Sequence, residues 1–243
     1  MRVVSVLALF LTAVAAKSLP ADIVRCSRSD PNLNRCLDVH VMEAVRKFAG
    51  GNKDLGISQL EPLLIDKIQL GDPDTLQQEY NNVQLYGITS ATILNSRANF
   101  SDENCHWDYE SVTPSTRMEA DYKVKGRLLL FHIDGQGKCN NTLYELQGQH
   151  SFKCEKYKKK NKTHIRITDH VFKFKPKRVV LDYDNIIVGN KQLSEEVRKT
   201  LNENSLAIYS DFGPALEKVM ASVWMQNVNR VFSRVPEDEL FLP

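Results

Sequence analysis

The chain has 243 residues, of which 42% are hydrophobic, and its 32 basic and 30 acidic side chains leave a formal net charge of +2. The hydrophobic content excludes a disordered chain, and the near balance of charges gives no overall attraction to a polyanion such as nucleic acid. The length fits one large domain or two small ones.

The first residues are typical of a secretory signal peptide. Met1-Arg2 carries positive charge, the run from Val3 to Val14 is largely apolar, and Ala15-Ala16 provides small residues for cleavage. About twelve apolar residues are too few for a membrane anchor, which needs roughly 18 or more, and no later segment is apolar enough to span a bilayer. We therefore expect residues 1–16 to be removed and the mature protein to be soluble, secreted and extracellular, with no stable membrane insertion.

A first helix is predicted after Asp30, which suits the N-cap position, with Pro31 in its first turn and Gly50-Gly51 as its end. Its apolar residues recur at helical spacing and are Leu33, Leu37, Val41, Ala44, Val45 and Phe48. The segment 55–68 follows. Because Pro62 excludes a long helix interior, we expect this segment to be extended and to enter a sheet.

From residue 83 to residue 184 the apolar pattern changes to a period of two, which is typical of strands. The predicted strands are 83–94, 104–112, 119–133, 138–157, 164–174 and 179–187. Asp134-Gly135-Gln136-Gly137 is the strongest hairpin signal, and Thr113-Pro114-Ser115 and Lys175-Pro176-Lys177 are further predicted turns. These strands predict an antiparallel meander, and no linker divides the chain, so we expect residues 17–243 to form a single domain.

A long helix is predicted from Asn190 to Arg234, with Glu195 and Glu196 in its first turn. Gly213-Pro214 lies near its middle, where proline removes a backbone donor, so we expect a kink or short break there; two ordinary helices split at Gly213 are the alternative. A long antiparallel sheet can cover such a helix by curling around it, and an apolar cavity can remain between the two. The predicted fold class is therefore α+β.

Five cysteines, at positions 26, 36, 105, 139 and 154, leave at least one thiol unpaired within the chain. Cys26 and Cys36 enclose the turn-forming group Asp30-Pro31-Asn32, which favours a disulfide between them. The other three cysteines allow three different single pairings. On one continuous strand Cys139 and Cys154 would lie about 50 Å apart at ~3.3 Å per residue, so joining them requires a turn near Gln147-Gly148.

Two surface features follow from the extracellular prediction. Glycosylation sequons begin at Asn99, Asn140 and Asn161, and each would place its asparagine at the surface. A basic stretch runs from Lys153 to Arg178 and includes Lys156, Lys158, Lys159 and Lys160. It is explained by a solvated sheet face; the alternative is an interaction module that binds anionic glycans or membrane through these lysines.

The sequence contains no pattern of a known catalytic or cofactor site. There is no GxSxG, HExxH, P-loop or GxGxxG motif, so we expect neither an enzyme nor a cofactor. His106-Trp107-Asp108 and Asp169-His170 place acid near imidazole, but adjacent residues of a strand face opposite ways. Asp182 and Asp184 are too few for a calcium site, which takes six to eight oxygens, so no metal is expected either.

Several short segments, in this order and spacing, resemble those of the insect takeout and juvenile-hormone-binding protein family. They are Cys26 with Cys36-Leu37, Gly56-Ile57, Leu60-Glu61-Pro62-Leu63, the run from Asp121 to Leu129, Gly135-Gln136-Gly137, Gly189-Asn190-Lys191-Gln192-Leu193, Leu201-Asn202-Glu203-Asn204, and the run from Val235 to Phe241. The resemblance covers nearly the whole mature chain.

The resemblance implies a long helix wrapped by a highly curved antiparallel sheet, a super-roll, around a hydrophobic tunnel. It implies a carrier without enzymatic activity that takes a terpenoid hormone such as juvenile hormone, or a fatty acid, with a link to circadian and feeding control. It assigns the shared disulfide to Cys26 and Cys36. No cysteine follows Cys154 to form the second bridge of the hormone-binding branch, which favours the takeout branch.

For a monomeric carrier of this kind, the relevant residues are apolar side chains between sheet and helix, with an occasional polar group to orient the ligand. Tyr144 could offer its hydroxyl to an ester, epoxide or acid. The predicted ligand-binding residues are Phe48, Phe131, Tyr144, Phe152, Phe212, Leu216, Trp224, Val228 and Phe232.

Overall fold

Two antiparallel strands of exceptional length form the body of the fold. In the computed structural model, which describes residues 17–72 and 75–243, β4 (Cys105–Leu128) has 24 residues and β5 (Phe131–Lys159) has 29, whereas strands usually have 3 to 10. They pair from Cys105 with Cys154 to Leu128 with Phe131. The signal peptide predicted for residues 1–16 lies outside the described residues.

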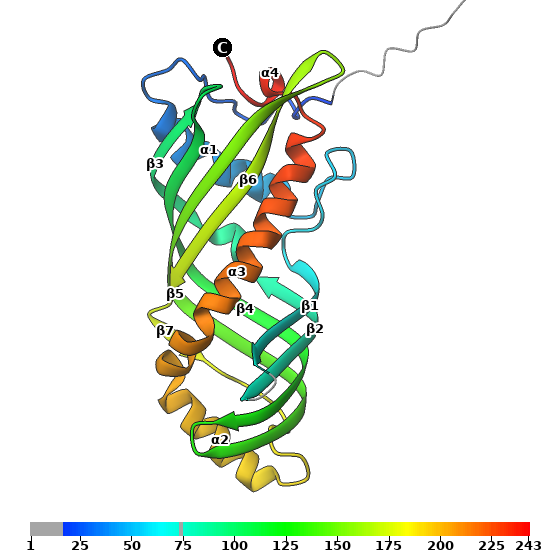
Figure 1. Cartoon of the computed structure of the whole chain (residues 1–243), viewed down its shortest axis with the longest axis vertical. Coiled ribbons are helices and arrows are strands. Elements are labelled where there is room, and N and C mark those ends of the chain that lie inside the picture. The colour runs from blue at the N-terminus through cyan, green and yellow to red at the C-terminus, as the bar shows by residue number, and fades with distance from the viewer. Residues whose placement is uncertain (1–16, 73–74) are drawn as a thin grey trace, which may run out of the picture.

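The other strands extend this pair into one antiparallel sheet with the order β1-β2-β4-β5-β6, in which β3 also pairs with β4 and β7 with β5. Their bounds are β1 Leu63–Asp72, β2 Leu76–Tyr86, β3 Thr92–Phe100, β6 Lys162–Lys175 and β7 Arg178–Val180. Figure 1 shows that the strands are strongly curved and that β1 and β2 lie on the opposite side of the long helix from β6.

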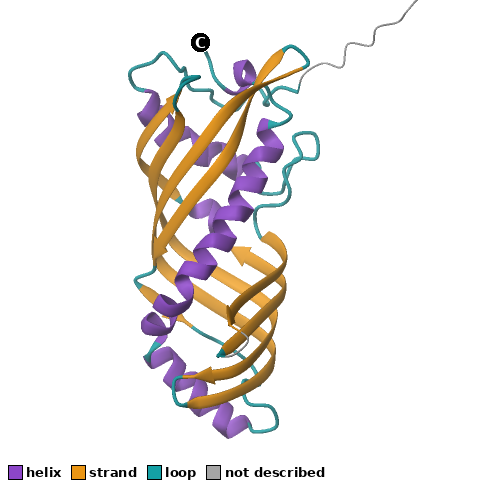
Figure 2. Ribbon diagram, in the orientation of Figure 1, coloured by secondary structure: helices purple, strands orange, loops and turns teal. Residues whose placement is uncertain are grey.

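Helices line the concave side and the ends of the sheet. They are α1 Leu33–Lys47, the 3-10 helix η1 Ile88–Ser90, α2 Lys191–Glu203, α3 Ser205–Phe232 and α4 Glu237–Leu240. Figure 2 shows α3 running obliquely along the molecule, with the strands wrapping behind it. Helices α1 and α4 lie near one end of the long axis and α2 lies at the other. This is the α+β super-roll that the family resemblance implies.

The predicted long helix is present but is interrupted at a different place. The break is at Asn204, whose φ of −112° and ψ of 13° leave the helical region and whose side-chain Nδ2 donates to the Thr200 carbonyl at 2.8 Å. Asparagine side chains compete for backbone groups in this way and so favour helix ends. The alternative prediction of two helices is therefore confirmed in number, but the split lies at Asn204 and not at Gly213.

Pro214 lies inside α3 instead of ending it. Contacts on both sides of this proline hold the helix to β6: the Tyr209 hydroxyl donates to the Phe174 carbonyl at 2.9 Å, and the Phe174 N–H donates to the Glu217 carboxylate at 3.1 Å. Tertiary packing thus outweighs the single backbone hydrogen bond that proline removes.

Two predicted turns are wrong. The β4–β5 hairpin turns at Leu129-Leu130, where Leu129 has a φ of +55°, and residues 134–137 lie inside β5. Gly135 is there because a Cβ would lie 2.5 Å from the Ile186 carbonyl oxygen, so glycine serves close packing rather than a turn. Residues 113–115 continue β4, whose pairing with β5 keeps its register across Pro114.

The remaining predictions of local structure are mostly confirmed, with shifted bounds. The turn at Lys175-Pro176-Lys177 joins β6 to β7. The segment 55–68 enters the sheet at Leu63 as expected. The predicted strand 83–94 instead includes η1, and after Val180 the predicted strand 179–187 makes only isolated bridges, such as Cys139 with Tyr183. Helix α1 begins at Leu33, and Asp30 instead accepts the Asn32 N–H at 2.7 Å in the turn before it.

Candidate ligand-binding site

An internal cavity of about 520 Å³ lies between the sheet and α3. Its wall includes Leu37 and Val41 from α1, Leu240 from α4 and Leu201 from α2, so it extends between the two ends of the molecule. The wall is predominantly aliphatic and aromatic because strands of the curved sheet turn every second side chain inward and α3 supplies one face of its helix. A space of this size and lining suits an apolar ligand.

Most of the residues predicted to bind ligand lie in this wall. They are Phe48, Phe152, Phe212, Leu216, Trp224, Val228 and Phe232. Trp224 and Val228 are four residues apart on α3, and the helical period places them on one face. The structure therefore brings the aromatic residues of α1 and β5 and the helix residues to one cavity.

Phe131 and Tyr144 do not line the cavity. Tyr144 is half-buried and lies under the Arg178 guanidinium, whose carbon is 3.8 Å from the ring centroid, while its neighbour Leu143 faces the cavity instead. Phe131 begins β5, pairs with Leu128 and packs beside the core. Tyr144 and Phe152 are an even number of residues apart, so strict alternation would place both on one face. The inward face of β5 instead changes at Glu145, whose φ is +49°, so that Leu143 and Leu146 line the cavity and Tyr144 does not.

Two sets of polar side chains lie along the apolar wall. The first, the histidine chain, consists of Ser111 of β4, His150 of β5 and His170 of β6. Ser111 Oγ lies 3.1 Å from His150 Nε2, His150 Nδ1 lies 3.2 Å from His170 Nε2, and His170 Nδ1 lies 3.0 Å from the Ala221 carbonyl of α3. Ser111 and His150 face the cavity. The chain therefore connects the cavity wall to the long helix.

The direction of each hydrogen bond in the histidine chain follows from its last member. A carbonyl oxygen only accepts, so His170 Nδ1 carries the hydrogen and, in a neutral ring, His170 Nε2 accepts from His150 Nδ1. His150 Nε2 is then an acceptor and takes the Ser111 hydroxyl hydrogen. Burial, together with the neighbouring His170, lowers the pKa of His150 to about 3, and burial lowers the pKa of His170, so both rings are neutral at pH 7.

Aromatic stacking fixes the histidine rings. The His150 ring centroid lies 4.4 Å from that of Tyr109 and 4.4 Å from that of Phe172, and the His170 centroid lies 3.8 Å from that of Phe152. Gly148, opposite Ser111 in the ladder, leaves room for this arrangement, because a Cβ there would lie 2.4 Å from Ser111 Oγ. The histidine chain is thus held from several strands at once.

The second set, the tyrosine chain, consists of Asn141 of β5, Tyr183, and Tyr80 and Gln78 of β2, and all four line the cavity. The Asp182 N–H donates to Asn141 Oδ1 at 3.0 Å, Asn141 Nδ2 donates to the Tyr183 hydroxyl at 2.9 Å, and the two tyrosine hydroxyls lie 2.8 Å apart. The Tyr80 hydroxyl donates to Gln78 Oε1 at 2.8 Å. Burial raises the pKa of both tyrosines, so the chain is uncharged.

Two buried polar atoms of wall residues have no hydrogen-bond partner in the described part of the chain: Gln78 Nε2 at the end of the tyrosine chain, and Asn227 Oδ1 of α3. Sequence reasoning found none of these polar groups. The sequence does place polar residues at inward positions of strands with a period of two, such as Ser111 two residues after Tyr109. Which of these residues contact one another depends on the register of the sheet, which the sequence does not show.

The cysteines form two disulfides in the described residues. Cys26 joins Cys36 with 5.8 Å between their Cα atoms, and Cys105 joins Cys154 with 4.9 Å between theirs, from directly opposite positions of β4 and β5. Cys139 is free and buried, and burial raises the pKa of its thiol to about 12, so it is unreactive. Cys139 and Cys154 lie on one continuous strand, without the turn that joining them would require.

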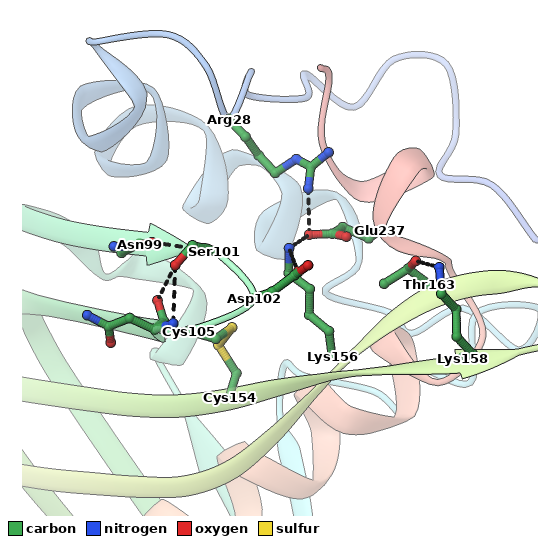
Figure 3. Close-up of polar contacts among 11 residues, drawn as sticks. Arg28, Asn99, Ser101, Asp102, Cys105, Cys154, Lys156, Lys158, Thr163 and Glu237 are labelled. Carbon is green, nitrogen blue, oxygen red and sulfur yellow. Dashed lines mark hydrogen bonds and ion pairs between the residues drawn. A yellow bond between two sulfur atoms is a disulfide. The ribbon is translucent and has the colours of Figure 1, made fainter.

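The asparagines of the three sequons, Asn99, Asn140 and Asn161, are all exposed. The basic stretch is largely paired within the chain. Figure 3 shows Lys156 between Asp102 and Glu237, at 2.9 and 2.8 Å, with Arg28 also 2.7 Å from Glu237.

Further lysines of this stretch are also occupied near the C-terminal end of the chain. Lys162 pairs with Asp238 at 2.5 Å and Lys159 donates to the Ser233 carbonyl at 2.7 Å. Lys158 donates to the Thr163 hydroxyl at 2.8 Å (Figure 3). Lys159 and Lys162 thus tie the β5–β6 hairpin to α4 and the segment before it, and Lys158 joins the two strands of the hairpin, which explains much of the basic stretch structurally.

The two histidines that lie next to or near an aspartate in the sequence, His106 and His170, contact other groups through their ring nitrogens. His106 Nδ1 lies 2.9 Å from Asn104 Oδ1, and the ring nitrogens of His170 contact His150 and Ala221 rather than Asp169. Within residues 17–72 and 75–243, no group of three or more His, Cys, Asp or Glu side chains is placed to hold a metal ion, and no helix is both long and apolar enough to cross a membrane.

Comparison with known proteins identifies the fold and the family of this chain. The crystal structure of Takeout 1 from Epiphyas postvittana superposes with a TM-score of 0.80 at 21% sequence identity, covering 90% of this chain and 99% of that one. The circadian clock-controlled protein daywake of Drosophila yakuba is 22% identical over 236 residues, which is 93% of this chain and 90% of the relative. The model of the haemolymph juvenile hormone binding protein family matches residues 4–242. The chain therefore belongs to the haemolymph juvenile hormone binding protein family, with the fold seen in Takeout 1.

Proposed function

We propose that this protein is a secreted, monomeric, non-enzymatic carrier that binds a small hydrophobic ligand in the cavity between the sheet and α3. The observation that carries the proposal is the cavity itself, which is large, apolar and bounded by elements from both ends of the fold. Membership of a family described by hormone binding supports the same function. The two disulfides suit an extracellular protein.

Burial of apolar surface is the main source of binding energy in this cavity. A ligand that buries about 250 to 400 Å² of apolar surface gains ~6 to 10 kcal/mol at ~25 cal/mol/Å², before the losses of motion and ordering are subtracted. Micromolar affinity corresponds to ~8 kcal/mol, so a ligand at the upper end of this range approaches it through apolar burial alone.

The wall favours a neutral ligand. Among the described residues, it contains no lysine, arginine, aspartate or glutamate side chain. An ionised carboxylate would lose its hydration there without gaining a counter-charge, which is unfavourable. We therefore favour a neutral terpenoid or ester, such as a terpenoid hormone, over an ionised fatty acid.

We also propose a physiological role, which is supported by a relative of this chain. The Drosophila yakuba relative is described as circadian clock-controlled, and we propose a similar link to daily rhythm or feeding for this chain. Its abundance should then vary over a light–dark cycle in the tissue that secretes it. A constant level over the cycle in fed and starved animals would contradict this part.

Ligand binding is tested by organic extraction of the protein from its native source, followed by mass spectrometry, and by fluorescence titration of the purified protein with the neutral probe N-phenyl-1-naphthylamine. A variant with Leu216→Trp fills the cavity from α3 and should weaken probe binding at least tenfold. Leu206→Trp is the matched control, since Leu206 lies on the same helix but is 49% exposed. Absence of both a copurified lipid and probe binding would refute the carrier function.

An interaction module that acts through the basic stretch has less support. Several of its lysines are engaged by Asp102, Glu237 and Asp238 or by the backbone of the same chain. Their charge is therefore partly neutralised before any glycan or membrane approaches.

A further inference from the structure

The tyrosine chain ends in an unused hydrogen-bond donor at the cavity wall. Gln78 lies on β2 between Leu76 and Tyr80, and all three line the cavity. Gln78 Oε1 accepts from Tyr80, but Gln78 Nε2 is buried and has no partner among the described residues. Most buried polar groups in proteins are hydrogen-bonded, so such an atom needs an explanation.

The orientation of the Gln78 amide is fixed by a backbone group three side chains away. Because the Asp182 N–H donates to Asn141 Oδ1, the Asn141 Nδ2 group must face Tyr183 and donate to its hydroxyl oxygen. In the arrangement that uses every hydrogen of the chain, the Tyr183 hydroxyl hydrogen goes to Tyr80 and the Tyr80 hydroxyl hydrogen goes to Gln78. Every hydrogen in the chain points toward Gln78.

Turning the Gln78 amide over would leave the Tyr183 hydroxyl hydrogen without an acceptor among these four side chains. The amide oxygen therefore faces Tyr80, and the two N–H groups face away from Tyr80. The open end of the chain is therefore a donor and not an acceptor. An unpaired buried donor destabilises a protein, whereas a ligand oxygen that accepts from it removes this cost on binding.

We propose that Gln78 donates a hydrogen bond to the ligand, and that the cavity takes an apolar molecule carrying a ketone or ester carbonyl at the level of β2. This rests on the carrier function proposed above and specifies its ligand. A carbonyl oxygen accepts hydrogen bonds and brings no hydrogen of its own, which matches a site that offers only N–H. A saturated hydrocarbon would leave the donor unpaired.

The test compares two probes of equal length, 2-tridecanone and tridecane, by their ability to displace N-phenyl-1-naphthylamine. The measured quantity is the ratio of the tridecane to the 2-tridecanone dissociation constant in each variant, because the cost of removing the ketone from water is the same in all of them. The informative pair is Tyr80→Phe and Tyr80→Phe/Gln78→Met, which differ only at residue 78; the Tyr183 hydroxyl that loses its Tyr80 partner is the same in both.

The ratio should fall about five- to tenfold from the single to the double variant, as expected for one hydrogen bond and the release of one unpaired donor. Gln77→Met makes the same substitution at the neighbouring position of β2, where the side chain is exposed and does not line the cavity, and it should keep the ratio of the wild type. Thermal unfolding and the affinity for N-phenyl-1-naphthylamine establish that each variant is folded.

An equal ratio in the two variants would overturn the role of Gln78 while leaving the carrier function intact. Failure of the wild-type protein to bind N-phenyl-1-naphthylamine or either probe would instead contradict the carrier function itself. The two failures are therefore distinguishable in one experiment.

Discussion

The histidine chain and the tyrosine chain lie in the same apolar wall but end differently. The histidine chain starts from an acceptor, the Ala221 carbonyl, and closes on the Ser111 hydroxyl, so that both histidine rings use both of their nitrogens. The tyrosine chain starts from a donor, the Asp182 N–H, and ends at Gln78 Nε2, which has no partner among the described residues.

This difference indicates that polar groups in an apolar cavity have two different roles. A closed chain satisfies its own members and therefore stabilises the protein by joining strands to a helix. An open chain stabilises less, but its free end recognises a complementary group. In both cases a backbone group fixes the orientation of the side chain at one end, Ala221 that of His170 and Asp182 that of Asn141.

The largest expected effect comes from removing the middle of the closed chain. His150→Ala should lower the free energy of unfolding by about 3 kcal/mol, because it leaves the Ser111 hydroxyl and His170 Nε2 without partners and removes a ring stacked between Tyr109 and Phe172. Urea denaturation measures the change. His132→Ala, an exposed histidine on the same strand, should change it by less than about 0.5 kcal/mol. A loss below about 1 kcal/mol for His150→Ala would show that the chain is not stabilising.

The closed chain should also make stability depend on pH. Burial lowers the pKa of His150 from 6.5 to about 3, so below pH 6.5 the unfolded chain takes up a proton that the folded chain does not. The free energy of unfolding should therefore fall as the pH falls, by about 2 kcal/mol for His150 between pH 6.5 and about 4.5. The lowered pKa of His170 acts in the same direction.

Denaturation curves measured across this pH range test the effect. His150→Phe should flatten the pH dependence, since phenylalanine keeps a ring but does not titrate, whereas His132→Asn should leave it as in the wild type. The same slope in His150→Phe and the wild type would assign the pH dependence to other groups.

These polar chains also mark the limit of what the sequence predicts. The long helix, the first helix and the strand-rich middle follow from apolar periodicity, which is a local property. The break at Asn204 does not follow from this periodicity, because it depends on a side chain that competes for the Thr200 carbonyl. The hairpin at Leu129-Leu130 does not follow from it either, because its tight turn consists of apolar residues.

The cavity wall shows the same division between local and long-range information. Helix residues such as Trp224 and Val228 line the cavity together, as their spacing predicts, because one turn of helix fixes their common face. Ser111 and His150 become neighbours only through the exact pairing of β4 with β5, where Ser111 stands opposite Gly148 and Tyr109 opposite His150. That register places residues 39 positions apart in contact and cannot be read from either strand alone.

A smaller effect is expected from the open chain. Replacing both Tyr80 and Gln78, as Tyr80→Phe/Gln78→Met, removes the unpaired Gln78 donor but leaves the Tyr183 hydroxyl hydrogen without its acceptor. One unpaired donor is thus exchanged for another, and the two effects on stability nearly cancel. The free energy of unfolding without ligand should change by less than about 1 kcal/mol, against about 3 kcal/mol for His150→Ala. If the double variant and His150→Ala lost the same free energy of unfolding, both chains would stabilise the protein equally, and the proposed difference between them would be wrong.

The smallest effect is expected at Tyr144, whose hydroxyl lies on the face of β5 away from the cavity. Tyr144→Phe keeps the ring under the Arg178 guanidinium and should change the affinity for N-phenyl-1-naphthylamine by less than about twofold. Leu143→Phe is the matched variant one residue earlier, on the cavity face, and its added volume should weaken binding several-fold. Fluorescence titration of the two variants compares opposite faces of one strand. A stronger effect at Tyr144 than at Leu143 would mean that ligand reaches the outer face of β5, and that hydrogen-bond recognition is not confined to the chains inside the cavity.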